Sequence, residues 1–140
     1  MRAPARLRSL LSTPGIKLMP CCHDAMSAKL VEAAGFPLTF VSGFATSAAH
    51  GLPDAGLLSF GEMSAAMRTI TSSLSTIPCM GDGDTGYGNA VNAKRTVSEY
   101  ARAGDSHTAP ILPTCHMPVF SQGITGKCLP QFDEQASRGL

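Results

Sequence analysis

A short apolar run, a turn and a helical pattern follow one another three times between residues 16 and 104. The three runs, at residues 16–22, 38–41 and 77–80, have the length and composition of buried strands. The connections between them are too short for anything but right-handed crossovers through helices. The repeat therefore predicts an α/β fold built on a parallel sheet that is buried on both faces.

Each predicted strand leads into a helix with a recognisable start. Asp24, Ser59 and Asn89 are placed as N-caps, and Ser59 forms a capping box with Glu62. A further helix is predicted over residues 5–12. The apolar positions at helical spacing, which we expect to be buried, are Leu7, Leu10 and Leu11 in the leading helix, Met26, Leu30, Ala33 and Ala34 in the next, Met63, Ala66, Met67, Ile70 and Leu74 in the third, and Ala90, Ala93, Val97, Tyr100 and Ala101 in the last.

Two segments are predicted to be irregular. Residues 44–58 form a long connection after the second strand, and long loops in compact domains are often functional. After residue 104 the repeat stops, and the expected fourth strand is missing from the pattern. Residues 105–140 hold four prolines and no sustained period, so we expect a mostly irregular C-terminal tail.

Composition excludes several classes of protein. With 44% apolar residues the chain can bury a core, and its 140 residues suit one domain. A net charge of +1 argues against a nucleic-acid surface, and no apolar run is long enough to cross a membrane. The five cysteines are odd in number and lack zinc-ligand spacing, which favours buried thiols in a reducing compartment and a cytoplasmic protein. The alternative is an organelle, because the first 23 residues include basic side chains and no acid.

The stretch GDGDTGYGN at residues 81–89 is the strongest candidate for a site. Its first six residues match the dinucleotide-binding pattern of three spaced glycines. However, Asp82 and Asp84 would then place two negative charges against a pyrophosphate. We therefore disfavour a nucleotide-binding module.

Two kinds of cation site remain to be compared with a simple turn. A calcium-binding EF-hand loop requires Gly and Glu where this chain has Tyr87 and Ala93. A magnesium site needs only one or two carboxylates, with water and substrate oxygens completing the shell, and Asp82 and Asp84 supply them. On the residues alone, a solvated acidic turn explains the stretch equally well.

Four tracts together resemble the phosphoenolpyruvate mutase/isocitrate lyase superfamily. They are PCCHDA at 20–25, AGF at 34–36 with VSGF at 41–44, GLPD at 51–54 with GLL at 56–58, and GDGDTGYGN at 81–89. Their order and spacing are similar to those of small members such as carboxyvinyl-carboxyphosphonate phosphorylmutase, oxaloacetate decarboxylase and 2-methylisocitrate lyase. The resemblance runs from about residue 7 to residue 104.

The resemblance implies a (β/α)8 barrel, of which residues 1–104 would supply an N-terminal helix and three βα units. It implies Mg²⁺, a small carboxylate substrate and a homo-oligomer. The reaction would break or form a C–C or P–C bond next to a carbonyl. Carried over by position, the ligand groups would be Asp82 directly on the metal, Asp84 and Asp54 through water, and Ser42, Gly43 and Phe44 on the substrate carboxylate.

The resemblance also implies a later loop of the Lys-x-Cys-Gly-His kind that carries an acid/base cysteine. Residues 105–140 do not contain it, so no catalytic residue is assigned. A complete barrel typically needs about 250 residues. We therefore expect residues 105–140 to be a non-family tail on a truncated enzyme with impaired activity. The alternative is a non-catalytic product that is inert or associates with full-length subunits.

Overall fold

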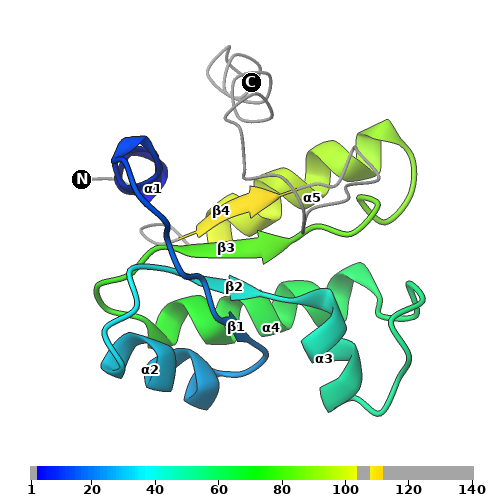
Figure 1. Ribbon diagram of the computed structural model, residues 1–140. Helices are drawn as coiled ribbons and strands as arrows, with labels where there is room; N and C mark the ends of the chain where they lie inside the picture. Colours follow the sequence, from blue (N-terminus) through cyan, green and yellow to red (C-terminus); the bar gives the residue numbers. More distant parts are fainter. Residues whose placement is uncertain (1–2, 104–107, 112–140) are drawn as a thin grey trace.

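Four parallel strands lie side by side in the order β1-β2-β3-β4 in the computed structural model, which describes residues 3–103 and 108–111 (Figure 1). The predicted α/β class is confirmed. None of the described helices is both long and apolar enough to span a bilayer. The elements are α1 (Ala3–Ser12), β1 (Cys21–Cys22), α2 (Ala25–Ala33), β2 (Thr39–Val41), α3 (Gly43–Ala49), α4 (Phe60–Ser73), β3 (Cys79–Asp82), α5 (Ala90–Ala103) and β4 (Thr108–Ile111).

The two faces of the sheet are covered by different helices. Successive strand side chains point to opposite faces, so Val41 and Cys79 join one cluster while Phe40 and Met80 join the other. The first cluster packs under α2, α4 and α5, with Met67 and Tyr100 fully buried. The second packs under α1, which contributes Leu7, Leu10 and Leu11. The predicted leading helix and the predicted apolar stripe of α4 are confirmed.

The predicted N-caps are confirmed. Asp24 accepts a backbone amide of α2 and completes a capping box. The Ser59 amide donates to the Glu62 carboxylate at 2.7 Å, and the Glu62 amide donates back to the Ser59 hydroxyl at 3.3 Å. Asn89 accepts from the Val91 amide at 2.9 Å at the start of α5. Local sequence therefore fixes where these helices begin.

The first strand is much shorter than predicted. Only Cys21 and Cys22 pair with β2, and the prediction of a buried strand over residues 16–22 is wrong for residues 16–20. Ile16 and Leu18 are 93% and 64% exposed. In the described sheet β1 lies at an edge, so this apolar run has a partner on one side at most.

The predicted buried face of α2 is also wrong. Met26 and Leu30 are 66% and 59% exposed, whereas Ala28 and Val31 are buried. The smaller side chains let the helix lie close to β1, β2 and α4, and the larger ones turn outward. In α5 Thr96 and Tyr100 are fully buried, so the predicted Tyr100 is confirmed and Thr96 was missed. Ala90 and Ala101, predicted on the buried face, are exposed.

Two predicted irregular stretches contain regular structure. Residues 43–49 form α3, capped by the Ser42 hydroxyl, inside the region predicted as a long loop. Residues 108–111 form β4, parallel to β3, so the prediction that no fourth strand follows the third helix is wrong for these residues. Pro110 lies in this strand, which is at an edge of the described sheet, where proline is tolerated because its missing amide need not donate. The remainder of the predicted tail, residues 105–107 and 112–140, lies outside the described residues.

A single carboxylate ties α2 to the loop before β3. Glu32 accepts from the backbone amides of Ser75, Thr76 and Ile77, and also from the Thr76 hydroxyl. These partners are 43 to 45 residues away in sequence. Burial opposes ionisation of this carboxyl, but the hydrogen bonds outweigh it and lower the pKa of Glu32. The contact lies at the amino ends of the strands, away from the site described next.

Candidate metal and carboxylate site

The candidate site lies at the carboxyl ends of the neighbouring strands β2 and β3 (Figure 1). Ser42 and Gly43 follow the end of β2, and Asp82 is the last residue of β3. β3 runs two residues further than predicted, so Asp82 is its last residue rather than part of the loop. The backbone of Asp82 is thereby held in the sheet. Ligand groups in parallel α/β sheets gather at this end.

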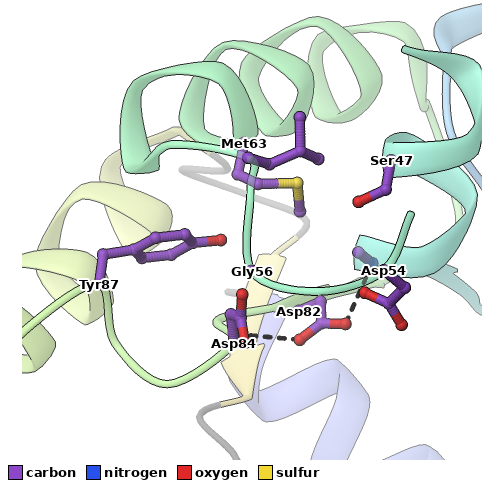
Figure 2. Close-up of a pocket in the computed structure, with 9 residues that line it drawn as sticks. Ser47, Asp54, Gly56, Met63, Asp82, Asp84 and Tyr87 are labelled. Atoms are coloured by element: carbon purple, nitrogen blue, oxygen red, sulfur yellow. Dashed lines mark hydrogen bonds between the residues drawn. The ribbon is translucent and has the colours of Figure 1, made fainter. Parts of the chain in front are cut away.

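Both oxygens of the Asp82 carboxylate accept a backbone hydrogen bond (Figure 2). The Gly43 amide donates to Oδ2 and the Asp84 amide donates to Oδ1, each at 3.0 Å. A Cβ at position 43 would lie 2.9 Å from Oδ2, so this approach requires glycine. The carboxylate therefore joins the start of α3 to the acidic loop and is oriented before any ligand binds.

The acidic loop turns back tightly toward α5. The Gly86 amide donates to the Gly83 carbonyl at 2.9 Å, and the Thr96 hydroxyl donates to the Gly86 carbonyl at 3.2 Å. Asp84 and Tyr87 both have positive φ angles, +48° and +59°. The loop is thus held by contacts to α5 in a conformation that non-glycine residues seldom adopt.

A pocket of about 40 Å³ lies between the acidic loop, α3 and the segment before α4 (Figure 2). This volume holds an ion with one or two water molecules, but it is far below the size of a pocket that encloses an organic ligand. The lining residues are Gly43, Ser47, Asp54, Gly56, Leu58, Met63, Asp82, Asp84 and Tyr87.

The pocket is electrostatically suited to a cation. Burial raises the pKa of Asp84, and the negative charges of Asp82 and Asp54 raise it further. None of the lining residues is Lys, Arg or His, so these charges are not balanced by a lining side chain. A bound divalent cation would relieve the repulsion among the three carboxylates.

The carboxylates are not arranged as a closed metal cage. Within residues 3–103 and 108–111, no group of three or more His, Cys, Asp or Glu side chains is gathered closely enough to hold a metal ion by itself. Mg²⁺ is usually bound by one or two carboxylates and keeps several water ligands. The geometry therefore fits an open site with one direct carboxylate better than a structural metal site.

The structure brings four of the six predicted site residues to this pocket. Gly43, Asp54, Asp82 and Asp84 line it. Ser42 does not, because its hydroxyl accepts from the Ala45 amide at 3.3 Å as the cap of α3.

Phe44 also lies outside the lining and is 66% exposed. The Gly43 amide, predicted to hold a substrate carboxylate, donates to Asp82. The substrate-binding roles of Ser42, Gly43 and Phe44 remain predictions.

Five lining residues were missed by sequence reasoning: Ser47, Gly56, Leu58, Met63 and Tyr87. The sequence predicts Met63 as a core residue, and its side chain is buried while also lining the pocket. Ser47 was hidden because α3 was not predicted. The alanines after the Ser42 cap were the available sign of that helix.

Aromatic side chains close one side of the site. The Tyr87 ring lines the pocket, and its hydroxyl lies 3.4 Å from the Tyr100 hydroxyl. Burial is the largest of the effects that raise the pKa of Tyr87 well above its usual range, and it also raises the pKa of Tyr100 to about 12. Both phenols therefore stay protonated at neutral pH.

The described residues supply no acid/base group in the pocket other than the three carboxylates and Tyr87. His50 contacts the Thr46 carbonyl through Nδ1 at 2.9 Å and does not line the pocket. Cys22 and Cys79 are buried in the sheet, as predicted, whereas Cys21 is exposed. Cys115 and Cys128 lie outside the described residues.

Comparison with known proteins identifies one family over most of the chain. The phosphoenolpyruvate phosphomutase family matches residues 7–107. The 2,3-dimethylmalate lyase of Eubacterium barkeri is 45% identical over 105 residues, 74% of this chain and 36% of the relative. The chloroplastic carboxyvinyl-carboxyphosphonate phosphorylmutase of Arabidopsis thaliana is 46% identical over 104 residues, 74% of this chain and 31% of the relative. The chain thus spans about a third of the length of the curated relatives it matches.

Solved structures agree with these matches. Phosphonopyruvate hydrolase in complex with oxalate and Mg²⁺ is similar with a TM-score of 0.70 and 39% identity, over 74% of this chain and 36% of that chain. A crystal structure of 2,3-dimethylmalate lyase is similar with a TM-score of 0.69 and 31% identity, over 77% of this chain and 36% of that chain. The family match, the curated relatives and the solved structures each cover about three quarters of the sequence, and the chain belongs to the PEP mutase/isocitrate lyase superfamily.

Proposed function

We propose that this chain carries the metal-binding part of a Mg²⁺-dependent enzyme that breaks or forms a C–C or P–C bond next to a carbonyl. The substrate class would be a small α-keto or hydroxy carboxylate. The observation that carries the proposal is the pair of hydrogen bonds that orient Asp82 between Gly43 and the acidic loop. Relatives named as lyases, a phosphorylmutase and a hydrolase support the reaction class.

The residues present fit Mg²⁺. Asp82 would bind the ion directly, and Asp84 and Asp54 would hold it through water, because three carboxylates face a pocket with no lining cation. Bound Mg²⁺ would supply the positive charge that stabilises an enolate next to the broken bond. Because the pocket has a volume of only about 40 Å³, it would hold the ion and its water ligands, and most of the substrate would bind outside it.

We also propose that the four strands are part of a (β/α)8 barrel. An open parallel sheet in consecutive order, with α2, α4 and α5 over one face, is what four adjacent strands of such a barrel look like. Full turnover would require groups beyond the described residues, since the pocket lacks an assigned acid/base cysteine.

Metal binding is the first test and turnover is the second. Isothermal titration of the chain with Mg²⁺ should show binding that Asp82→Asn removes. Glu99→Gln is the matched control, because Glu99 forms ion pairs with exposed arginines on α4 and α5 and does not line the pocket. Oxaloacetate and 2-methylisocitrate are then assayed with Mg²⁺ or EDTA. Wild-type binding that survives in Asp82→Asn, or turnover insensitive to EDTA, would contradict the proposal.

A second candidate is a non-catalytic product that associates with full-length subunits. It is favoured by the exposed apolar side chains beside β1, namely Ile16, Leu18, Met26 and Leu30. Metal binding without turnover, together with self-association, would favour this candidate over the first.

A further inference from the structure

Two residues of the acidic loop hold a conformation that is unfavourable for L-amino acids. Asp84 and Tyr87 have φ angles of +48° and +59°. Such residues persist only where the surrounding structure holds them, and they gather at ligand sites. Asp84 supplies one of the three pocket carboxylates. Whatever holds this stretch of backbone therefore also sets where that carboxylate lies.

Tyr87 anchors this stretch to the rest of the fold. Its ring meets the ring of Phe60 edge-on, with centroids 5.8 Å apart and an angle of 62° between the planes. Phe60 in turn stacks on Tyr100 at 6.4 Å and 13°, and Tyr100 is fully buried. The aromatic cluster of Phe60, Tyr87 and Tyr100 thus connects the loop to the start of α4 and to α5.

The ring of Tyr87, rather than its hydroxyl, makes the stronger contact. The two phenol oxygens of Tyr87 and Tyr100 are 3.4 Å apart, which is long for a hydrogen bond between hydroxyls. Edge-to-face aromatic pairs at the observed separation are favourable beyond the area they bury. Figure 2 shows the Tyr87 ring on one side of the pocket and Asp54 on the other.

We propose that Tyr87 is a positioning residue for the metal site. Packing of its ring against Phe60 keeps the loop in the turn, with Asp84 and Tyr87 at positive φ, that presents the Asp84 carboxylate to the pocket. The consequence for metal affinity rests on the proposed function, whereas the consequence for loop order does not.

Three substitutions separate the ring from the hydroxyl and from backbone strain. Tyr87→Phe keeps the ring and removes the hydroxyl. Tyr87→Gly removes the ring and relieves the positive φ, so strain of a new side chain adds nothing to its effect, but glycine also loosens the backbone. A third variant, Tyr87→Asn, removes the ring, tolerates the positive φ and restricts the backbone more than glycine does, so a loss that it shares with Tyr87→Gly comes from the missing ring. Val91→Ala is the control, because Val91 is exposed at the start of α5 and does not line the pocket.

Affinity for Mn²⁺, measured by the electron paramagnetic resonance signal of the free ion, is the first readout. We expect Tyr87→Phe and Val91→Ala to bind like wild type. Tyr87→Gly should bind about tenfold to a hundredfold more weakly, the usual effect of losing a residue that orients a metal ligand. If Tyr87→Phe binds Mn²⁺ as weakly as Tyr87→Gly does, the positioning role does not belong to the ring and the proposal is overturned.

Amide hydrogen exchange without metal is the second readout. The Asp84 amide donates to the Asp82 carboxylate at the end of β3, and the Gly86 amide donates to the Gly83 carbonyl. Both amides should exchange faster when the ring of Tyr87 is removed and not in Tyr87→Phe or Val91→Ala. Unchanged exchange in Tyr87→Gly would overturn the proposal whatever the metal result. Faster exchange combined with no Mn²⁺ binding by wild type would support the positioning role and count against the proposed function. Thermal melting followed by far-UV circular dichroism verifies that each variant is folded.

Discussion

The amide of Gly43 donates to Oδ2 of Asp82 at 3.0 Å, across 39 residues of sequence. The two residues come from the ends of neighbouring strands, and their contact leaves no room for a side chain at position 43. The carboxylate is thereby held in one orientation by the backbone of α3. Removing a hydrogen-bond partner that orients a metal ligand typically weakens metal binding by about tenfold to a hundredfold.

Gly43→Ala is therefore expected to weaken metal binding. The added Cβ would lie 2.9 Å from Oδ2 and would push the carboxylate away. We expect about a tenfold rise in the Kd for Mn²⁺ or Mg²⁺, measured by titration calorimetry. Gly61→Ala is the matched control, because a Cβ there would meet nothing closer than 3.8 Å and helix α4 favours alanine. Equal affinity of Gly43→Ala and Gly61→Ala would contradict the expectation.

Glu32→Gln should destabilise the fold in a pH-dependent way. The ionised Glu32 carboxylate accepts from three backbone amides. The uncharged side chain of Gln accepts these bonds less well, so the substitution should lower the free energy of unfolding by about 1 kcal/mol near neutral pH. Because folding lowers the pKa of Glu32 from its ordinary value of 4.5, this stabilisation is complete above that pH. It is lost as pH falls through the lower folded pKa.

Urea unfolding of wild type and Glu32→Gln between pH 7 and pH 3 measures this difference. The gap between the two proteins should narrow as the solution becomes more acidic. Glu99→Gln serves as the control, since its exposed ion pairs contribute little. A gap that stays constant over the whole pH range would rule out the carboxylate as its source.

Local signals predicted most of the fold, and long-range contacts explain where they did not. Asp24, Ser59 and Asn89 are followed by helices because capping depends on a few adjacent residues. Met26 and Leu30 are exposed because of the elements against which α2 packs. The spacing of apolar residues along the helix does not show which elements these are. A single sequence shows an apolar stripe but not its partner.

The candidate site was predictable in part for the same reason. Asp54, Asp82 and Asp84 stand in short motifs, and they do line one pocket. The contact of Gly43 with Asp82 and the packing of Tyr87 on Phe60 join distant segments, so neither could be found from spacing alone. The fourth strand was missed because it contains Pro110. Proline argues against a central strand, and the sequence does not show which strands lie at the edge of the sheet.

Self-association is expected from the edge that β1 forms in the described sheet. Ile16 and Leu18 are exposed beside this strand, and apolar groups next to an open edge favour contact with another chain. Sedimentation velocity should show a sedimentation coefficient that rises with concentration. The double substitution Ile16→Lys and Leu18→Lys should suppress this rise, whereas Val91→Lys, on α5, should not. A monomer at all concentrations would refute the expectation.

Gly81→Ala should destabilise the core beneath the site. A Cβ at this position would lie 2.5 Å from Cε and 2.7 Å from Sδ of Met67, whose side chain is fully buried. Overpacking of this kind costs about 1–3 kcal/mol in the free energy of unfolding. Met67→Ala alone should also destabilise the protein, by leaving a cavity.

The double variant with both substitutions should be more stable than the sum of the two single losses predicts, because the new methyl group at position 81 enters the space that Met67 leaves. Urea unfolding of the four proteins gives the coupling free energy, and simple additivity would show that position 81 and Met67 do not compete for the same space.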